Sequence, residues 1–145
     1  MTAEPILLVE DNPDDVTLTV RALRKNDIEN EVVVAGDGEQ ALALLHPPDG
    51  TPLKPALVLL DVKLPLVAGL DVLRKIRADE RTRMLPVVML TTSNEARDIT
   101  DSYQLGANSF VRKPVEFSDF IEVTRLLGRY WLVLNQPVPT RLGGV

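Results

Sequence analysis

Short apolar runs alternate with amphipathic stretches along most of the sequence. The first run, residues 6–9, has no polar position, as expected of a strand that is covered on both faces of a sheet. Apolar residues then recur at helical spacing, at Val16, Val20 and Leu23. The same alternation predicts further strands at 31–35, 56–60, 86–90 and 109–112, and further helices at 39–45, 70–76, 95–105 and from about residue 116.

Strands that alternate with helices of this length form a parallel sheet with helices on both faces, joined by right-handed crossovers. The pattern therefore predicts an α/β fold, a single flavodoxin-like doubly wound domain with a five-stranded parallel sheet. We expect this domain to span residues 1–135. Residues 136–145 are expected to form a C-terminal tail, because Pro137 and Pro139 favour an extended segment over further helix.

Composition narrows the possible functions. The 145 residues are 45 % apolar and 26 % charged, which is ordinary for a folded domain that buries its own core. A net charge of -5 argues against nucleic acid as a partner, since binding to phosphate backbones needs clustered Lys and Arg. The sequence has no cysteine, no secretion signal and no apolar run long enough to span a membrane. We therefore expect a cytoplasmic protein that does not bind membranes.

Polar side chains follow four of the five predicted strands. In an open parallel sheet the carboxyl ends of the strands share one edge, where ligands bind. Glu10 and Asp11 follow the first strand, Asp61 the third, Thr91 the fourth and Lys113 the fifth. We expect these side chains to form one site.

Three carboxylates on one edge would repel one another by about 4 kcal/mol per pair at 4 Å and an effective dielectric constant of 20. Lys113 alone cannot balance that charge. A hard divalent cation such as Mg²⁺ can, through carboxylate, carbonyl and water oxygens. Asp61 is the best candidate nucleophile, because a buried strand leads directly into it, which leaves Glu10 and Asp11 to bind the metal.

Each of these residues also has an ordinary structural explanation. An acidic pair after a strand commonly caps a helix, and a single Asp there commonly forms a turn. Thr91 could belong to a helix cap, and Lys113 could be a solvated charge. Taken together they occupy four strand ends on one edge, which coincidence would seldom produce.

With these residues in place, the sequence resembles a response-regulator receiver domain of two-component signalling, from about residue 6 to residue 134. The family's motifs occur in order as Leu-Leu-Val-Glu-Asp, Leu-Leu-Asp-Val-Lys-Leu-Pro, Leu-Thr-Thr-Ser and Phe-Val-Arg-Lys-Pro. The resemblance implies that Asp61 is the phosphoacceptor and Asp11 a direct metal ligand. It also implies that Glu10 binds the metal through water and that the backbone carbonyl of Lys63 completes the ligands.

The resemblance assigns the remaining site residues to a switch. Thr91 would be the switch hydroxyl, Lys113 the lysine that pairs with the phosphoryl group, and Phe110 the aromatic residue that moves with Thr91. Ala68, Phe110 and Val115 depart from the residues most frequent in the family, but none of these departures removes a reacting group.

The long loop at residues 46–55 and the C-terminal residues 128–135 resemble those of single-domain regulators that partner bacterial phytochrome-type histidine kinases. We therefore expect phosphotransfer from a kinase to Asp61 and signalling to an unknown downstream protein. The protein would not be an enzyme beyond catalysing its own phosphorylation and slow dephosphorylation. Alternatives are a docking module that is never phosphorylated, a flavodoxin-like cofactor binder, or a metal-dependent phosphohydrolase. Lys63 argues against the hydrolase, because it stands where such enzymes place an acid.

The C-terminal end carries an apolar stripe at helical spacing, formed by Leu126, Leu127, Tyr130, Trp131 and Leu134. Part of this stripe extends past the length that the sheet can cover. We expect a homodimer whose interface includes Leu126, Tyr130, Trp131 and Leu134. The alternative is that Trp131 folds back onto its own domain.

Overall fold

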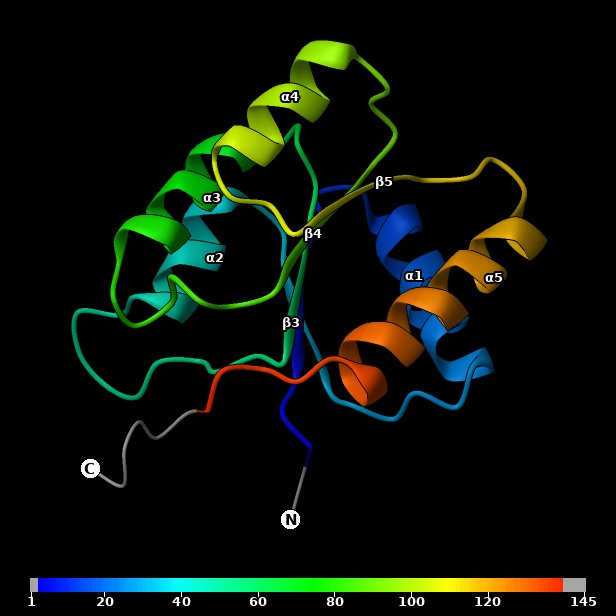
Figure 1. The fold of residues 1–145 in the computed structure, drawn as a ribbon, viewed down its shortest axis with the longest axis horizontal. Coiled ribbons are helices and arrows are strands. Elements are labelled where there is room, and N and C mark those ends of the chain that lie inside the picture. The colour runs from blue at the N-terminus through cyan, green and yellow to red at the C-terminus, as the bar shows by residue number, and fades with distance from the viewer. Residues whose placement is uncertain (1–2, 140–145) are drawn as a thin grey trace.

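A computed structural model describes residues 3–139 of the chain. Strands and helices alternate along the chain, as the apolar pattern predicts (Figure 1). The elements are β1 (Ile6–Val9), α1 (Pro13–Lys25), β2 (Val32–Ala35), α2 (Gly38–Leu45), β3 (Leu57–Leu60), α3 (Gly69–Ala78), β4 (Val87–Thr91), α4 (Ala96–Gln104), β5 (Ser109–Arg112), α5 (Phe117–Gly128) and the π-helical segment η1 (Arg129–Leu134).

The five strands form one parallel sheet in the order β2-β1-β3-β4-β5, which confirms the predicted flavodoxin-like fold. Figure 1 shows α1 and α5 on one face of the sheet and α2, α3 and α4 on the other. Strands β1, β3 and β4 are buried along their whole length, because helices cover both of their faces. Their apolar side chains belong to two core clusters, one on the face of α2, α3 and α4 and one on the face of α1 and α5.

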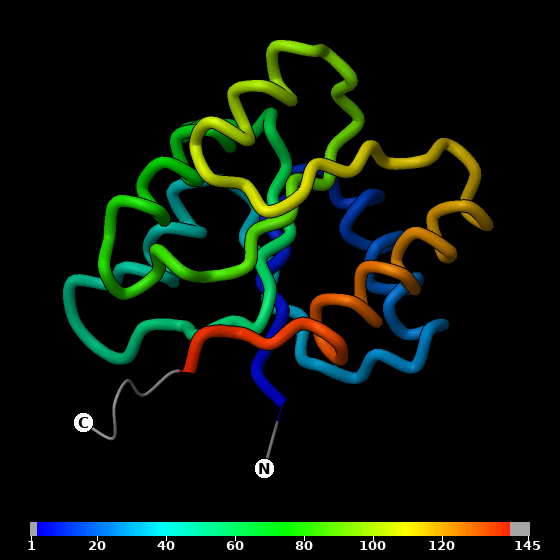
Figure 2. The backbone as a smooth tube through the Cα atoms, in the orientation of Figure 1, coloured from blue at the N-terminus to red at the C-terminus, as the bar shows by residue number. Residues whose placement is uncertain are grey.

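The end of the chain differs from a single long helix. Helix α5 ends at Gly128 and continues as η1, in which the amide of Asn135 donates to the carbonyl of Tyr130 at 2.6 Å. Such bonds between residues five apart widen the helix, so side chains no longer follow the spacing of an α-helix. Beyond η1 residues 135–139 form no helix or strand, and Figure 2 shows the chain leaving α5 here as a red tube. Residues 140–145 of the predicted tail lie outside the described residues.

Gly69 fixes the connection that follows β3. Its amide donates to the carbonyl of Val62 at 2.9 Å. A Cβ atom at Gly69 would lie 1.9 Å from the carbonyl oxygen of Asp61, which is far closer than atoms can approach. The first turn of α3 therefore packs directly against the backbone of Asp61, and only glycine fits there.

We expect Gly69→Ala to lower the free energy of unfolding by about 1–3 kcal/mol, because the added methyl overpacks this contact. Alanine would otherwise favour a helical position, so the close contact alone makes the change unfavourable. Gly36→Ala is the matched control, since its nearest atom would be the Oε1 atom of Gln40 at 3.7 Å. Urea unfolding of both variants measures the difference, and equal stabilities would contradict it.

Candidate functional site

Three carboxylates meet at the carboxyl edge of the sheet. Glu10 and Asp11 directly follow β1, and Asp61 directly follows β3, the neighbouring strand. One oxygen from each carboxylate lies within 4.8 Å of the other two. Glu10 is 3 % exposed and Asp61 8 %, while Asp11 faces solvent. The structure thus brings the predicted acidic residues together, with one open side.

The hydroxyl of Thr91 contacts Asp61 directly. Its Oγ1 atom donates to Oδ1 of Asp61 at 2.7 Å and accepts from the amide of Ser93 at 3.2 Å. The amide of Lys63 also donates to Oδ1 of Asp61, at 3.3 Å. Because Thr91 is the last residue of β4 and is fully buried, the sheet itself holds the hydroxyl against the carboxylate.

Lys113 reaches across the site from the end of β5. Its Nζ atom pairs with Oε1 of Glu10, with Oδ2 of Asp61 at 3.5 Å and with Oδ2 of Asp15 at 3.2 Å. Asp15 is a contact that the sequence analysis missed. An acid in the first turn of a helix is already explained by the helix dipole, so nothing in the sequence distinguished Asp15 from Asp14.

Burial and ion pairing shift the titration of this cluster. Burial raises the pKa of Glu10 to about 7, against the opposing effect of Lys113. Burial alone would lower the pKa of Lys113, but its pairing with Glu10, Asp61 and Asp15 outweighs this and raises it. Lys113 therefore stays charged, while Glu10 titrates near neutral pH.

Two more predicted residues lie around this centre. Phe110, on β5, is half-buried and packs against the core cluster on the face of α2, α3 and α4. Its amide donates to the hydroxyl of Tyr103, in α4, at 3.2 Å. The side chain of Lys63 points to solvent, with its Nζ atom 3.9 Å from Oε1 of Glu95.

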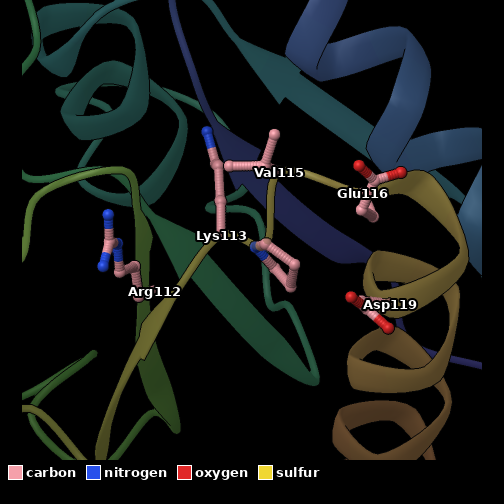
Figure 3. Close-up of a pocket in the computed structure, with 6 residues that line it drawn as sticks. Arg112, Lys113, Val115, Glu116 and Asp119 are labelled. Carbon is pink, nitrogen blue, oxygen red and sulfur yellow. The ribbon is translucent and has the colours of Figure 1, made fainter.

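A pocket of about 310 Å³ lies beside Lys113, between the end of β5 and the start of α5 (Figure 3). Lys113 is the predicted site residue that lines this pocket. The other lining residues are Arg112, Pro114, Val115, Glu116 and Asp119.

The predicted interface residues do not all face the same way. Leu126, Tyr130 and Leu134 are each more than half exposed. Trp131 is half-buried against the core cluster on the face of α1 and α5. Its ring packs edge-on against that of Tyr130, with the two ring centroids 4.9 Å apart. Leu127 lies one helical turn earlier and packs against the same cluster, so Trp131 continues the buried face of α5, whereas Leu126, Tyr130 and Leu134 lie on the exposed face.

Comparison with known proteins identifies the family. The sequence family described as the response regulator receiver domain matches residues 6–125, which is most of the chain. The chain belongs to the response-regulator receiver family. Its members are response regulators, which are signalling proteins.

Three relatives resemble this receiver domain over nearly its whole length. Response regulator Rcp1 of Synechocystis is 34 % identical over 88 % of either chain. A bacteriophytochrome response regulator, AtBRR, has a solved structure with 49 % identity and a TM-score of 0.71, covering 94 % of this chain and 100 % of that one. The solved structure of the phosphorylated cyanobacterial phytochrome response regulator RcpA is 32 % identical with a TM-score of 0.86, covering 95 % of this chain and 100 % of that one.

The site fits a divalent cation. Rcp1 has been solved in a Mn²⁺-bound form that is 31 % identical, with a TM-score of 0.86 over 94 % of this chain and 100 % of that one. In this chain carboxylate oxygens of Glu10, Asp11 and Asp61 converge, and oxygen ligands suit Mg²⁺ and Mn²⁺ alike. Within residues 3–139, every helix is too short or too polar to cross a membrane.

We expect the Mg²⁺ affinity of the receiver domain to rise between pH 6 and pH 8. Because the raised pKa of Glu10 is about 7, this carboxyl is mostly protonated at pH 6 and mostly ionised at pH 8, and a metal favours the ionised form. The affinity should fall by up to about tenfold for each pH unit below 7.

Metal titrations of wild type and Glu10→Gln at several pH values test this expectation. The variant should bind weakly with little pH dependence, while Glu39→Gln, a change at an exposed carboxylate on α2, should behave like the wild type. An unchanged pH profile in Glu10→Gln would show that another group titrates.

Proposed function

We propose that Asp61 is the phosphoacceptor, which takes a phosphoryl group from a phosphohistidine of a partner histidine kinase. The contacts around its carboxylate carry this proposal, because Thr91 lies against one oxygen and Lys113 against the other. In the transfer an oxygen of Asp61 forms a bond to phosphorus. The bond between phosphorus and the imidazole nitrogen breaks, and that nitrogen keeps the electron pair.

The surrounding residues have separate roles in this proposal. Asp11 would bind Mg²⁺ directly, Glu10 through water and Lys63 through its backbone carbonyl. When bound, Mg²⁺ supplies positive charge that offsets the carboxylates and the phosphoryl oxygens. The convergence of Glu10, Asp11 and Asp61 on one open edge supports this assignment.

We infer that Thr91, Lys113 and Phe110 convert phosphorylation into a signal. The phosphoryl group adds about -1.5 to -2 charges at Asp61. Lys113 can pair with this charge and Thr91 can transfer its hydrogen bond from Asp61 to a phosphoryl oxygen. Phe110 is half-buried on the neighbouring strand, so its packing can follow Thr91 and alter the surface near α4 and β5.

A phytochrome-type histidine kinase is the proposed partner. Two of the relatives are named as phytochrome or bacteriophytochrome response regulators. Such a kinase phosphorylates itself from ATP, so the protein would act in the cytoplasm and pass its signal to a downstream protein. In this proposal residues 1–135 form the receiver domain and residues 136–145 a tail, and the protein catalyses only its own phosphorylation and slow dephosphorylation.

The proposal predicts that Mg²⁺ with a small phosphodonor adds one phosphoryl group to the wild type and none to Asp61→Asn. The variant retains the shape of the side chain but lacks the nucleophilic carboxylate. Intact mass spectrometry measures the addition, and Asp71→Asn, a change at a half-exposed acid on α3, is the control that should be labelled like the wild type. A wild type that is never labelled would favour a docking module that does not react.

We also propose that the protein is a homodimer through the exposed side chains of its C-terminal end. Leu126, Tyr130, Val133 and Leu134 are each more than half exposed on α5 and η1. Apolar side chains gathered on one segment are typical of a protein contact. Trp131 would support the interface from beneath, because it packs edge-on against Tyr130.

The double change Tyr130→Glu with Leu134→Glu should weaken dimerisation by about tenfold or more, because it places charges in an apolar contact. Both side chains are exposed, so the fold should tolerate the change. Met84→Glu alters an exposed apolar residue before β4 and serves as control. Sedimentation at micromolar concentration measures the assembly, and a monomeric wild type would rule the dimer out.

A further inference from the structure

Leu66 has a backbone conformation that leucine seldom adopts. Its φ angle is +67°, and the amide of Val67 donates to the carbonyl of Pro65 at 2.8 Å. These features define a γ-turn of the strained, positive-φ kind, centred on Leu66. Among residues 3–139, Asp27 is the other non-glycine residue with a positive φ, and Asp tolerates that region far better than Leu.

The turn is held by packing on both sides. Leu64 and Val67 pack against the core cluster on the face of α2 and α3. The closeness of α2 adds to this, since a Cβ atom at Gly38 would lie 2.2 Å from the carbonyl oxygen of Val67. Leu66, between them, turns outward and is 75 % exposed. The fold therefore holds a strained backbone in a form that presents an apolar side chain to solvent.

Leu66 lies in the connection from β3 to α3, which begins with Asp61. Asp61 is 8 % exposed, so a donor that reacts with it must approach closely and cover the surrounding edge. Val115, which is 96 % exposed, lies on the same edge in the connection from β5 to α5 and lines the pocket in Figure 3. The exposed ion pair of Lys63 and Glu95 adds charges of both signs.

We propose that Leu66 is a docking residue for the histidine kinase, and that it packs against apolar side chains beside the phosphohistidine. This inference rests on the proposed phosphotransfer to Asp61. Backbone strain that a fold maintains next to a reactive group commonly serves function. An apolar centre with a charged surround is also the usual composition of a protein contact.

A kinase is the occupant that this position favours. The donor of the phosphoryl group must cover the edge around Asp61 in every transfer, whereas a downstream protein need not. The exposed apolar side chains of α5 and η1 offer a second copy of the chain a different surface. During transfer the bond between phosphorus and the imidazole nitrogen breaks, a bond from phosphorus to Asp61 forms, and the imidazole takes up a proton from water.

The test uses Leu66→Asn and Leu66→Gly, because Asn and Gly both accept a positive φ and lack the apolar side chain. Two phosphodonors are compared in Mg²⁺. Phosphoramidate has the same phosphorus–nitrogen bond but no protein surface, and an autophosphorylated bacteriophytochrome kinase that labels the wild type supplies that surface. Met84→Asn, at an exposed apolar residue before β4, is the matched control.

We expect both Leu66 variants to be labelled by phosphoramidate at the wild-type rate and by the kinase with a kcat/KM about tenfold lower. Thermal unfolding should show both variants folded, and Met84→Asn should match the wild type with either donor.

Transfer from the kinase at the wild-type rate would overturn the proposal. An equal loss with both donors would also overturn it, because Leu66 would then act by positioning Asp61. A loss of self-association with unchanged transfer would assign the side chain to a contact between copies of this chain. If wild type is labelled by neither donor, the proposed phosphotransfer itself fails, which is a different result.

Discussion

The largely buried ammonium group of Lys113 is the charge on which the arrangement around Asp61 depends. It contacts carboxylates from the connection after β1, from the connection after β3 and from α1, so one side chain joins three parts of the fold. Removing one partner of such a buried pair typically costs about 3–5 kcal/mol, since the remaining charges lose their compensation. The backbone supports this position, because the amide of Lys113 donates to the carbonyl of Thr91 at 2.7 Å.

This ammonium group also explains how three acids can share one edge. Glu10 and Asp61 are buried beside Lys113, whereas Asp11 faces solvent and remains available. A divalent cation at the open side would add positive charge where Lys113 cannot reach. The site therefore combines a fixed charge, which the fold supplies, with an exchangeable one, which would come from solution.

The segments around this site are closely packed against it and against one another. Gly69 brings α3 against the backbone of Asp61, and Gly38 brings α2 against Val67. The connection from β3 to α3 therefore has little freedom, and within it Leu66 adopts a strained turn. Rigidity of this kind keeps the carboxylate of Asp61 in place while the solvent-facing side chains remain available for contacts.

The sequence by itself determined the order of strands and helices and the five residues at the strand ends, Glu10, Asp11, Asp61, Thr91 and Lys113. Buried strands require continuous apolar runs, and parallel strands place their carboxyl ends on one edge, so both features can be read from local pattern. The motifs that resemble receiver domains also led to the correct family, because each is a short stretch of sequence at a strand end.

Only the tertiary structure decided three other features. It paired Asp15 with Lys113, packed Trp131 against the core of its own domain, and held Leu66 at a φ of +67°. Each depends on contacts between segments far apart in the sequence or on a backbone conformation that local preference opposes. Residue types and spacing specify which side chains are available, whereas packing decides which of them meet and which remain exposed.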